Sequence, residues 1–461
     1  MRHVVVMAST GAIGLIAVFA VDLINLFYIS LLGQKEIAAA VGFSGVVGFL
    51  QASIAIGMMI GVGAVVSRAI GAGQFADARR MATGSLVVMA AIMAVLAAIT
   101  LAALEPLLTA LGASGETRVL AAQFLLIAVP SVPLMSAGMC CSALLRSVGD
   151  ARRAMNITLL AALTTAILDP ILIFGLHLGL SGAAISTVLS RCVMAYLALR
   201  SVTRSHDMLG RLSLPDLPAD MRRVFAIAGP AVLTNLATPV GAAYVTASMA
   251  TFGAGAVAGQ ATIDRLSPVA FGLVYALSGT VGPILAQNLG AGRLDRVQSA
   301  LRDAMLFMVI AVTGAWLVLA AGQSLIVWAF RAEGVTAELI HLFCSWLAVA
   351  FLFNGALFVG NAVFNNLGFP LLSTAFNWGR ATLGTIPLVT WGAHYGPLGV
   401  LAGQAAGSAV FGAAAAATAF YVVRRMDTTS AAGPDSVVPL VGGSGQAALA
   451  VIVARPESAA R

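Results

Sequence analysis

Charged residues are scarce in this sequence of 461 residues. Asp, Glu, Lys and Arg make up only 9% of it, whereas hydrophobic residues make up 60%. A soluble domain carries roughly 25% charged residues, so this composition excludes an ordinary soluble protein. The formal net charge of +7 would suggest nucleic-acid binding in a soluble chain, but here the arginines gather between long apolar segments. That arrangement indicates membrane topology, and we expect no nucleic-acid partner.

Cysteine is nearly absent as well. The four cysteines, Cys140, Cys141, Cys192 and Cys344, all fall inside apolar segments. Their positions exclude a secreted disulfide framework and show no metal-ligand spacing, so we expect small buried side chains and no bound metal. We also expect no cleavable signal peptide, because the first apolar segment is longer than the roughly 7 to 15 residues of a signal peptide's apolar core.

Long apolar segments divide the chain into twelve predicted membrane-spanning helices of about 20 residues or more. Arg, Gly, Pro or acidic residues separate these segments. The predicted fold is therefore an all-α integral membrane protein with twelve transmembrane helices. The approximate boundaries are 8–32, 39–67, 81–104, 118–143, 155–176, 180–201, 223–251, 266–289, 303–328, 337–363, 370–391 and 396–422.

Basic residues are distributed unevenly between the connections on the two sides of these spans. If the N-terminus is inside, the inner segments hold fifteen arginines, whereas the outer connections hold four basic residues, namely Lys35, Arg118, Arg265 and Arg331. Because short inner loops carry the excess of Lys and Arg, both termini are predicted to be cytoplasmic. We expect a multi-pass protein of the bacterial inner membrane, surrounded by lipid and monomeric.

Two short glycine motifs recur at one offset along the chain. Gly73 ends a Gly-Ala-Gly motif after the second span and Gly292 ends another after the eighth, and their numbers differ by 292 − 73 = 219. Gly149 after the fourth span and Gly368 after the tenth differ by the same 368 − 149 = 219. The pattern predicts two pseudo-symmetric six-helix lobes, as in transporters built from parallel repeats. We expect the glycines themselves to end helices in tight turns.

The longest connection between predicted helices contains Pro215, Pro218 and several charged residues, and is the natural boundary between the two halves. We predict an N-terminal lobe at 1–201, a cytoplasmic inter-lobe linker at 202–222 and a C-terminal lobe at 223–425. Residues 426–461 are rich in Ser, Gly, Ala and Pro. That composition predicts a disordered cytoplasmic tail.

Two acidic side chains, Asp22 and Asp169, are the only ones predicted to lie well inside a span. An ionised Asp at membrane depth is costly, so each is a functional-site candidate. They would lie roughly 15 Å and roughly 10 Å from the outer ends of their helices, and they could share one chamber if the helices are neighbours. Two carboxyls in one site repel when both are ionised, so the pair suits carrying a proton or binding a cation. The alternative is a carboxyl that only hydrogen-bonds a neighbouring helix.

Several other polar residues are predicted inside the spans. Thr165 lies one turn before Asp169, and Asn25 lies three residues after Asp22, so each could hydrogen-bond its neighbouring acid. Plain interhelical hydrogen bonding is an equal alternative for both. Arg380, predicted inside the eleventh span, either pairs with a carbonyl or lines the substrate cavity. Arg191 is predicted near a helix end, where its side chain would reach the interface.

Proline and glycine mark predicted bends in the helices. Pro170 removes one helical hydrogen bond and is expected to kink the fifth span. Aligning the two halves places Pro170 opposite Pro387 and Asp169 opposite Ile386, so the kink recurs while the charge does not. The sequence thus places ion coupling in one half only. Gly11 and Gly14 give the first span places to bend.

At these residues the chain resembles the multidrug and toxic compound extrusion (MATE) family of cation-coupled antiporters, over residues 5 to about 425. The order and spacing of the matching pieces carry the resemblance. These pieces are Val21-Asp22, Ala38-Ala39-Ala40-Val41-Gly42, Ser67-Arg68-Ala69-Ile70-Gly71-Ala72-Gly73, Leu145-Arg146-Ser147-Val148-Gly149-Asp150, Ile167-Leu168-Asp169-Pro170 and Gly179-Leu180-Ser181-Gly182-Ala183-Ala184.

The resemblance implies an exporter whose two six-helix lobes surround a central V-shaped cavity, and which exchanges inward H+ or Na+ for outgoing organic cations. It implies that Asp22 and Asp169 are ion-coupling acids of the N-terminal lobe and that Thr187 is a polar residue of their pocket. Many members have Asn at the position of Thr165. The acids that sodium-coupled members place in the seventh and tenth helices are absent, which favours H+ and argues against an ion site in the C-terminal lobe.

We therefore expect a secondary antiporter that exports cationic or amphipathic drugs and toxic organic compounds, with no cofactor and no enzymatic activity. The two lobes are expected to rock about the linker between them. One alternative is a lipid-linked oligosaccharide flippase of the same superfamily, which would need several cavity arginines where only Arg380 is a clear candidate. Another alternative is an integral membrane enzyme such as a prenyltransferase, which would need clustered Asp-rich motifs that the sequence lacks.

Overall fold

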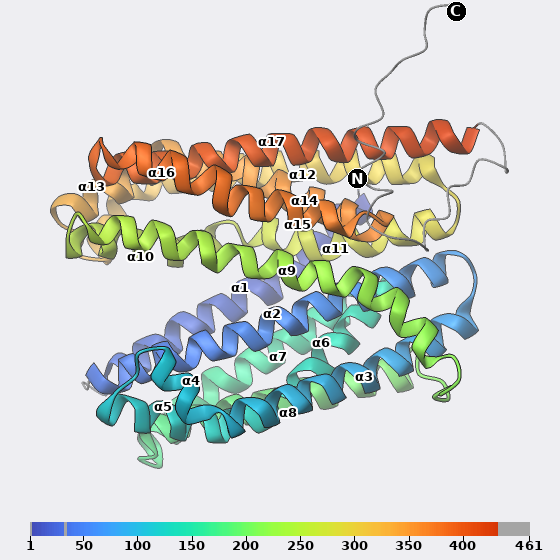
Figure 1. The fold of residues 1–461 in the computed structure, drawn as a ribbon, viewed down its shortest axis with the longest axis horizontal. Helices are drawn as coiled ribbons and strands as arrows, with labels where there is room; N and C mark the ends of the chain where they lie inside the picture. The colour runs from blue at the N-terminus through green and yellow to red at the C-terminus, as the bar shows by residue number, and fades with distance from the viewer. Residues whose placement is uncertain (1, 32–34, 432–461) are drawn as a thin grey trace, which may run out of the picture.

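The computed structural model describes residues 2–31 and 35–431, and these residues form helices joined by short turns (Figure 1). The first half contains six long helical segments and the short helix α4 (Leu104–Ala110). In chain order the six segments are α1 (Arg2–Leu31), α2 (Lys35–Gly71), α3 (Phe75–Ala102), α5 (Gly115–Ala128) continued by η1 (Val129–Ser131) and α6 (Val132–Ser147), α7 (Ala151–Pro170) continued by η2 (Ile171–Gly175), and α8 (Gly179–Arg204).

The second half repeats this plan with more interruptions. Its six segments are α9 (Leu217–Ala250), α10 (Ala254–Ala270) with α11 (Gly272–Gly290), α12 (Leu294–Ala329), α13 (Gly334–Leu342) continued by η3 (Phe343–Leu347), η4 (Ala348–Ala350) and α14 (Phe351–Leu367), α15 (Pro370–Gly379) continued by η5 (Arg380–Gly384) and α16 (Thr385–Ala393), and α17 (Gly396–Ala431). The predicted tail therefore begins as a continuation of α17, and its part beyond residue 431 lies outside the described residues.

The predicted twelve-helix membrane fold is confirmed. Among the described residues, 9 helical spans are long and apolar enough to cross a membrane, and α10 with α11 forms a tenth that bends by 53°. The first segment and the interrupted eleventh segment complete the set. The predicted start of the eighth span at residue 266 is wrong, because α10 begins at Ala254. Gln260, Asp264 and Arg265 interrupt the apolar pattern there and hid the first half of this span.

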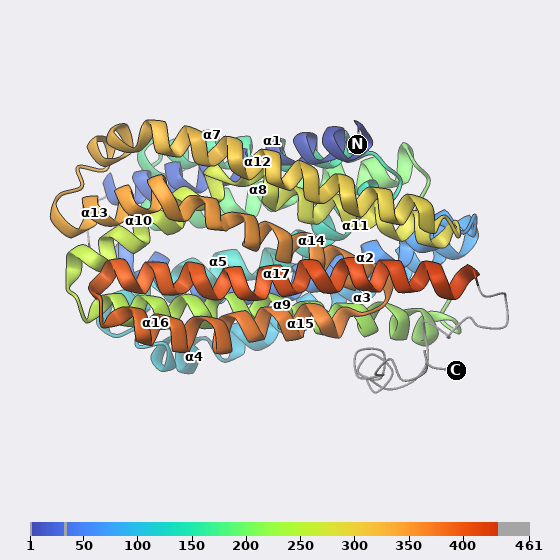
Figure 2. The same ribbon diagram turned by 90° about the horizontal axis from the view of Figure 1, so that it is seen from above.

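The helices form two lobes with separate hydrophobic cores, and α1 reaches from one lobe to the other (Figures 1 and 2). The lobes contact one another where α1 packs on α11, and where α2 packs on α9 and α11. Glycine permits the close approach. A Cβ on Gly61 of α2 would lie 2.7 Å from the carbonyl oxygen of Val224 in α9. The two lobes are therefore held together by backbone-to-backbone packing of helices.

One crossing between the lobes lies at the ends of α2 and α11, where the two glycine motifs of the repeat meet. A Cβ on Gly71 would lie 2.0 Å from the carbonyl oxygen of Gln287, and one on Gly290 would lie 2.1 Å from that of Arg68. Gly73 and Gly292 then end their helices with φ of 75° and 69°, as predicted for tight turns. The glycine motifs thus end helices and also bring two backbones into contact.

Two hydrogen bonds flank this crossing and are related by the internal repeat. The guanidinium of Arg68 donates from Nη2 to the carbonyl oxygen of Asn366 at 2.7 Å, and Nε2 of Gln287 donates to the carbonyl oxygen of Ser147. The donors and the acceptors are each separated by the offset of the repeat, since 287 − 68 = 219 and 366 − 147 = 219. We call the glycine crossing and these two bonds the lobe clamp. Its two halves are equivalent because each lobe supplies one donor and one acceptor.

The segment between the lobes is held to the N-terminal lobe. The guanidinium of Arg80 in α3 binds the buried carboxylate of Asp220 at 2.9 Å, and Arg79 pairs with the exposed Asp207 at 2.9 Å. Nε2 of His206 lies 2.9 Å from Oδ2 of Asp150. Burial alone would raise the pKa of Asp150, but hydrogen bonds from His206 and the Arg153 amide, with the charge of Arg153, hold it below its usual range. The first turn of α9 is therefore fixed to the N-terminal lobe.

This anchoring predicts unequal effects of two neighbouring arginines. Replacing Arg80→Gln leaves the Asp220 carboxylate, which is 4% exposed, without its cation. We expect the free energy of unfolding to fall by about 2 to 3 kcal/mol. The fall is somewhat less than for a fully buried pair because the Arg80 side chain is 31% exposed. Arg79→Gln is the matched control, since surface pairs contribute only about 0 to 1 kcal/mol. Thermal unfolding in detergent measures both, and equal melting temperatures would contradict the assignment.

Candidate functional site

A cavity of about 890 Å³ lies between the two lobes and is lined by both. This volume falls in the range of roughly 300 to 1,000 Å³ that ligand sites occupy. The N-terminal lobe contributes a largely apolar face with several methionines, among them Met59, Met139, Met155 and Met194. Methionine side chains adapt to irregular shapes, so this face can accommodate different apolar ligands.

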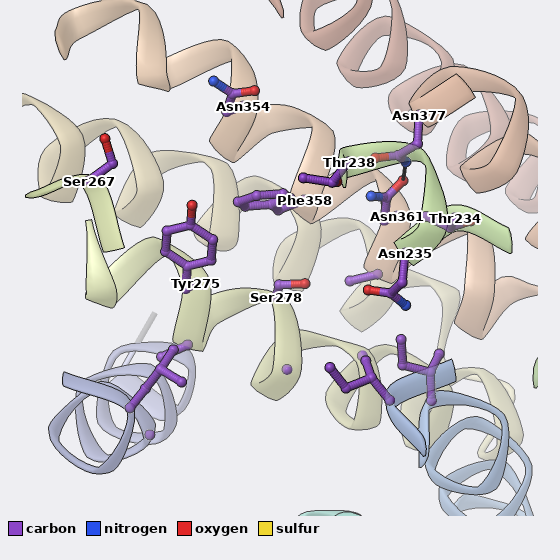
Figure 3. Close-up of a pocket in the computed structure, with 18 of the residues that line it drawn as sticks. Thr234, Asn235, Thr238, Ser267, Tyr275, Ser278, Asn354, Phe358, Asn361 and Asn377 are labelled. Carbon is purple, nitrogen blue, oxygen red and sulfur yellow. Dashed lines mark hydrogen bonds between the residues drawn. The ribbon is translucent and has the colours of Figure 1, made fainter. Parts of the chain in front are cut away.

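The C-terminal lobe contributes a polar face (Figure 3). Asn377 donates from Nδ2 to Oδ1 of Asn361 at 2.9 Å, and Asn235 uses its own Nδ2 to bond the Ala231 carbonyl at 2.8 Å. Figure 3 shows Asn235 from α9 opposite Ser278 from α11, with the Asn361–Asn377 pair drawn above Asn235. The two faces together make the cavity amphipathic, with apolar groups on one side and amides on the other.

Aromatic rings form a continuous group on the same C-terminal face. The ring of Tyr275 lies 5.7 Å from that of Phe351 and 5.2 Å from that of Phe358, and Phe19 of α1 meets it edge-on at 6.1 Å. All four rings line the cavity. Such a group offers flat apolar surface to a planar ligand ring.

Three charged side chains line the cavity, and two of them were not assigned to it from the sequence. Arg380 was named as a cavity candidate, and the structure places it in the lining. Arg146 was counted among the topology arginines, but it lies in α6 and lines the cavity. Asp264 was counted outside the spans, but it lies in α10, where Nε2 of Gln260 donates to it at 2.9 Å. An acid therefore faces the cavity from the C-terminal lobe, where the sequence suggested none.

Asp169 is buried in the N-terminal lobe, apart from this cavity. Its side chain is 1% exposed, and neither carboxylate oxygen has a hydrogen-bond partner among the described residues. The hydroxyl of Ser186 in α8, which is also buried without a partner among the described residues, lies close to this carboxyl. An unpartnered buried carboxyl costs free energy, so its retention calls for a function.

Asp22 lies on α1, which packs directly against α7, so the helices of the two predicted acids are neighbours. The Asp22 side chain is exposed in the isolated protein, and neither acid lines the central cavity. The structure thus brings the two helices together and leaves the two carboxyls in different surroundings, one enclosed and one accessible.

The other predicted polar residues surround this region in different ways. Oδ1 of Asn25 is buried and has no partner among the side chains and backbone that the structure describes. The hydroxyls of Thr165 and Thr187 donate to carbonyls of their own helices, those of Ala161 and Ala183. Thr187 also lines a smaller pocket of about 180 Å³ with Arg191.

The sequence suggested that the Arg191 side chain reaches the membrane interface, and the structure instead places it inside the N-terminal lobe. Its Nη1 donates to the Ala128 carbonyl at 3.0 Å and to Oγ of Ser131 at 2.9 Å. These acceptors lie at the interruption of the fourth span by η1, where helical hydrogen bonding is broken. The arginine is held inside the lobe because those backbone and hydroxyl oxygens are available to it.

The predicted bends have different outcomes in the structure. After Pro170 the fifth span continues as a π-helix, and in the C-terminal lobe a π-helix at Arg380–Gly384 comes just before Pro387. Both prolines thus accompany a change in helical hydrogen bonding. The first span is one continuous helix through Gly11 and Gly14. These glycines permit close packing here, against Thr280 for Gly11 and Met155 for Gly14, and bending at them stays a prediction.

Among the residues that the structure describes, no group of three His, Cys, Asp or Glu side chains is placed to hold a metal ion. Cys140, Cys141 and Cys344 are buried free thiols. The chemistry of the site therefore consists of hydrogen-bonding groups, three cavity charges and the two acids near α1 and α7.

Comparison with known proteins gives a consistent result. A model of the MatE family matches residues 12–171 and 230–391. The chain is 31% identical to the FAD transporter of Shewanella oneidensis, over 84% of this chain and 87% of that protein. It is 26% identical to the multidrug export protein MepA of Staphylococcus haemolyticus, over 66% of this chain and 68% of that protein. Its fold is similar to that of the Vibrio cholerae MATE transporter VcmN in the bent form, with a TM-score of 0.86, 24% identity, and coverage of 93% of this chain and 97% of that one.

Proposed function

The chain belongs to the MatE family, and from that premise we propose that it is a secondary active antiporter that exports small organic molecules in exchange for protons. Its named relatives are transporters, so the chain is a membrane transporter and not an enzyme. The observation that carries the coupling proposal is the buried, unpartnered carboxyl of Asp169 on a helix that packs against α1.

A proton is the coupling ion that this arrangement favours. A proton needs only a carboxylate oxygen, whereas a metal cation needs several oxygen ligands around it. Protonation also removes the cost of a buried charge, so binding the proton would stabilise the enclosed state of Asp169.

Helix α1 connects the acids to the substrate cavity in this proposal. One of its faces packs on α7, which carries Asp169, and another packs on α11 of the opposite lobe. Gly11 and Gly14, at these two contacts, both line the cavity. A change in charge at Asp22 or Asp169 would alter the packing of α1 and hence the cavity wall. The lobes would then move relative to one another, with bending beyond the anchored first turn of α9, as at Pro230 inside that helix.

The orientation follows from the arginine-rich connections, which we place in the cytoplasm together with both termini. In that orientation the lobe clamp closes the cytoplasmic side of the cavity. We propose the bacterial inner membrane as the location and a monomer as the working unit.

The substrate has two candidate classes. Cationic or amphipathic drugs fit the methionine-rich face and Asp264, and relatives named multidrug export proteins support them. Flavin nucleotides such as FAD, which the Shewanella relative is named for, fit the aromatic group and the two cavity arginines. With two arginines in the cavity, the alternative function of an oligosaccharide flippase has more support than it had from the sequence. The long substrate of a flippase would still need more arginines than these two.

Purified protein in proteoliposomes tests the antiport proposal. With an imposed pH gradient and no other energy source, we expect uptake of a fluorescent substrate that an uncoupler abolishes. Substrate added without a gradient should in turn move protons in the opposite direction. Uptake that is unaffected by the uncoupler and by the pH gradient would exclude proton-coupled exchange.

A further inference from the structure

The intramembrane arginines of this chain fall into two groups. Arg68 and Arg191 donate to backbone carbonyls within hydrogen-bond distance. Arg146 and Arg380, which line the cavity, have no carboxylate within ion-pair distance in the described part of the chain. Arg146 contacts the thioether of Met59 at 3.9 Å, and Nε of Arg380 is buried without a partner. Each arginine of the first group donates to a backbone oxygen, although Nε of Arg68 is also buried without a partner among the described residues. In the described part of the chain, neither Arg146 nor Arg380 donates to an oxygen.

The cavity acid does not neutralise these two arginines. Asp264 accepts its hydrogen bond from Gln260 and lies beyond ion-pair distance from both guanidiniums. The lining contains two positive side chains and one negative one, so its formal charge is 2 − 1 = +1. A low-dielectric cavity with excess positive charge attracts an anionic group and resists a cationic one.

The arginines are placed so that a ligand can reach both of them and the aromatic group. Arg146 extends from the N-terminal lobe toward α11, where Nη1 lies 3.9 Å from the position of a Cβ on Gly279. Arg380 lines the same cavity from the C-terminal lobe, as does Tyr275. Tyr275 and Gly279 are one helical turn apart on α11. Both arginines and the aromatic group therefore face one cavity, with Arg146 reaching it beside α11.

We propose that the cavity binds an aromatic organic anion, with Arg146 and Arg380 holding its phosphate or carboxylate groups and Tyr275, Phe351 and Phe358 packing on its planar ring. Guanidinium forks bind phosphate and carboxylate oxygens in bidentate fashion, which suits two arginines that have no acidic partner. This assignment rests on the export function proposed above and specifies its substrate class. It makes negatively charged flavin nucleotides better ligands than cationic drugs.

Equilibrium binding to the full-length protein in nanodiscs tests the assignment without an ion gradient, so its failure is separate from a failure of proton coupling. FMN and FAD are compared with riboflavin, which has the same ring system without phosphate, and with ethidium as a planar cation. We expect both nucleotides to bind at least about tenfold more tightly than riboflavin, with an advantage that shrinks as salt is raised. Ethidium is expected to bind more weakly than FMN.

Variants then identify the groups responsible. Arg146→Gln and Arg380→Gln should each weaken FMN binding about tenfold and leave riboflavin binding within about twofold, and Lys at either position should restore part of the affinity. Arg302→Gln, an exposed arginine on α12, is the matched control and should change neither ligand. Equal affinity of the wild-type protein for FMN and riboflavin would overturn the proposal, even if a variant failed to fold. Tighter binding of ethidium than of FMN, or full FMN affinity in both Gln variants, would overturn it as well.

Discussion

Proteoliposomes containing Asp169→Asn are expected to show no substrate-dependent proton movement above protein-free liposomes. The substitution keeps the size of the side chain and removes the only titratable group at this enclosed position, where exposure of the native side chain is 1%. Without a carboxyl, helix α7 can neither accept nor release a proton, and we expect Asp22, which is exposed on α1, not to replace the enclosed site. The loss should be complete because coupling needs a group that exists in two protonation states.

A matched surface variant and a binding assay make this result specific. Asp295→Asn, at an exposed ion pair with Arg293, should exchange protons at the wild-type rate. Asp169→Asn itself should still bind the substrate, since Asp169 lies outside the cavity lining. Comparable amounts of both variants must be inserted in the liposomes. Substrate-dependent proton movement retained by Asp169→Asn would rule out the coupling mechanism.

Much of the architecture could be predicted because membrane-spanning helices are long and apolar. The number of segments and the two-lobe arrangement followed from hydropathy and from the constant offset between the repeated glycine motifs, and the structure confirms the fold. The neighbouring placement of α1 and α7 was a hypothesis that depended on tertiary packing, and the contacts between these helices bear it out. A single anomalous carboxyl such as Asp169 can be recognised because ionisable side chains at membrane depth are costly.

The cavity charges could not be predicted, for two physical reasons. Asp264 lies in the first half of a bent span, where three polar or charged side chains lower the hydropathy and conceal the helix. Arg146 lies near the end of α6, where an arginine that faces water and one that faces a cavity give the same sequence pattern. Only packing distinguishes them. The internal repeat does contain one clue. Its offset relates Arg146 to Asn365, since 365 − 146 = 219, and Asn365 also lines the cavity.

Replacing Gly71→Ala is expected to slow transport about 5- to 140-fold, because the lobe clamp has no room for a methyl group. The new Cβ would lie 2.0 Å from the carbonyl oxygen of Gln287, which belongs to the backbone and cannot rotate away. Overpacking of this kind costs about 1 to 3 kcal/mol, so the equilibrium constant for closing the clamp would fall by the corresponding factor, and we expect the transport rate to follow it. Gly290→Ala should have the same effect, since the repeat makes the two positions equivalent.

Gly45→Ala is the matched control. Gly45 is on the same helix as Gly71 and has no atom within 4 Å of its Cβ position, so this variant should transport normally. Hydrogen exchange of residues 68–74 and 287–293 should rise in both clamp variants only; unchanged transport and exchange in Gly71→Ala would show that the clamp does not control the transport cycle.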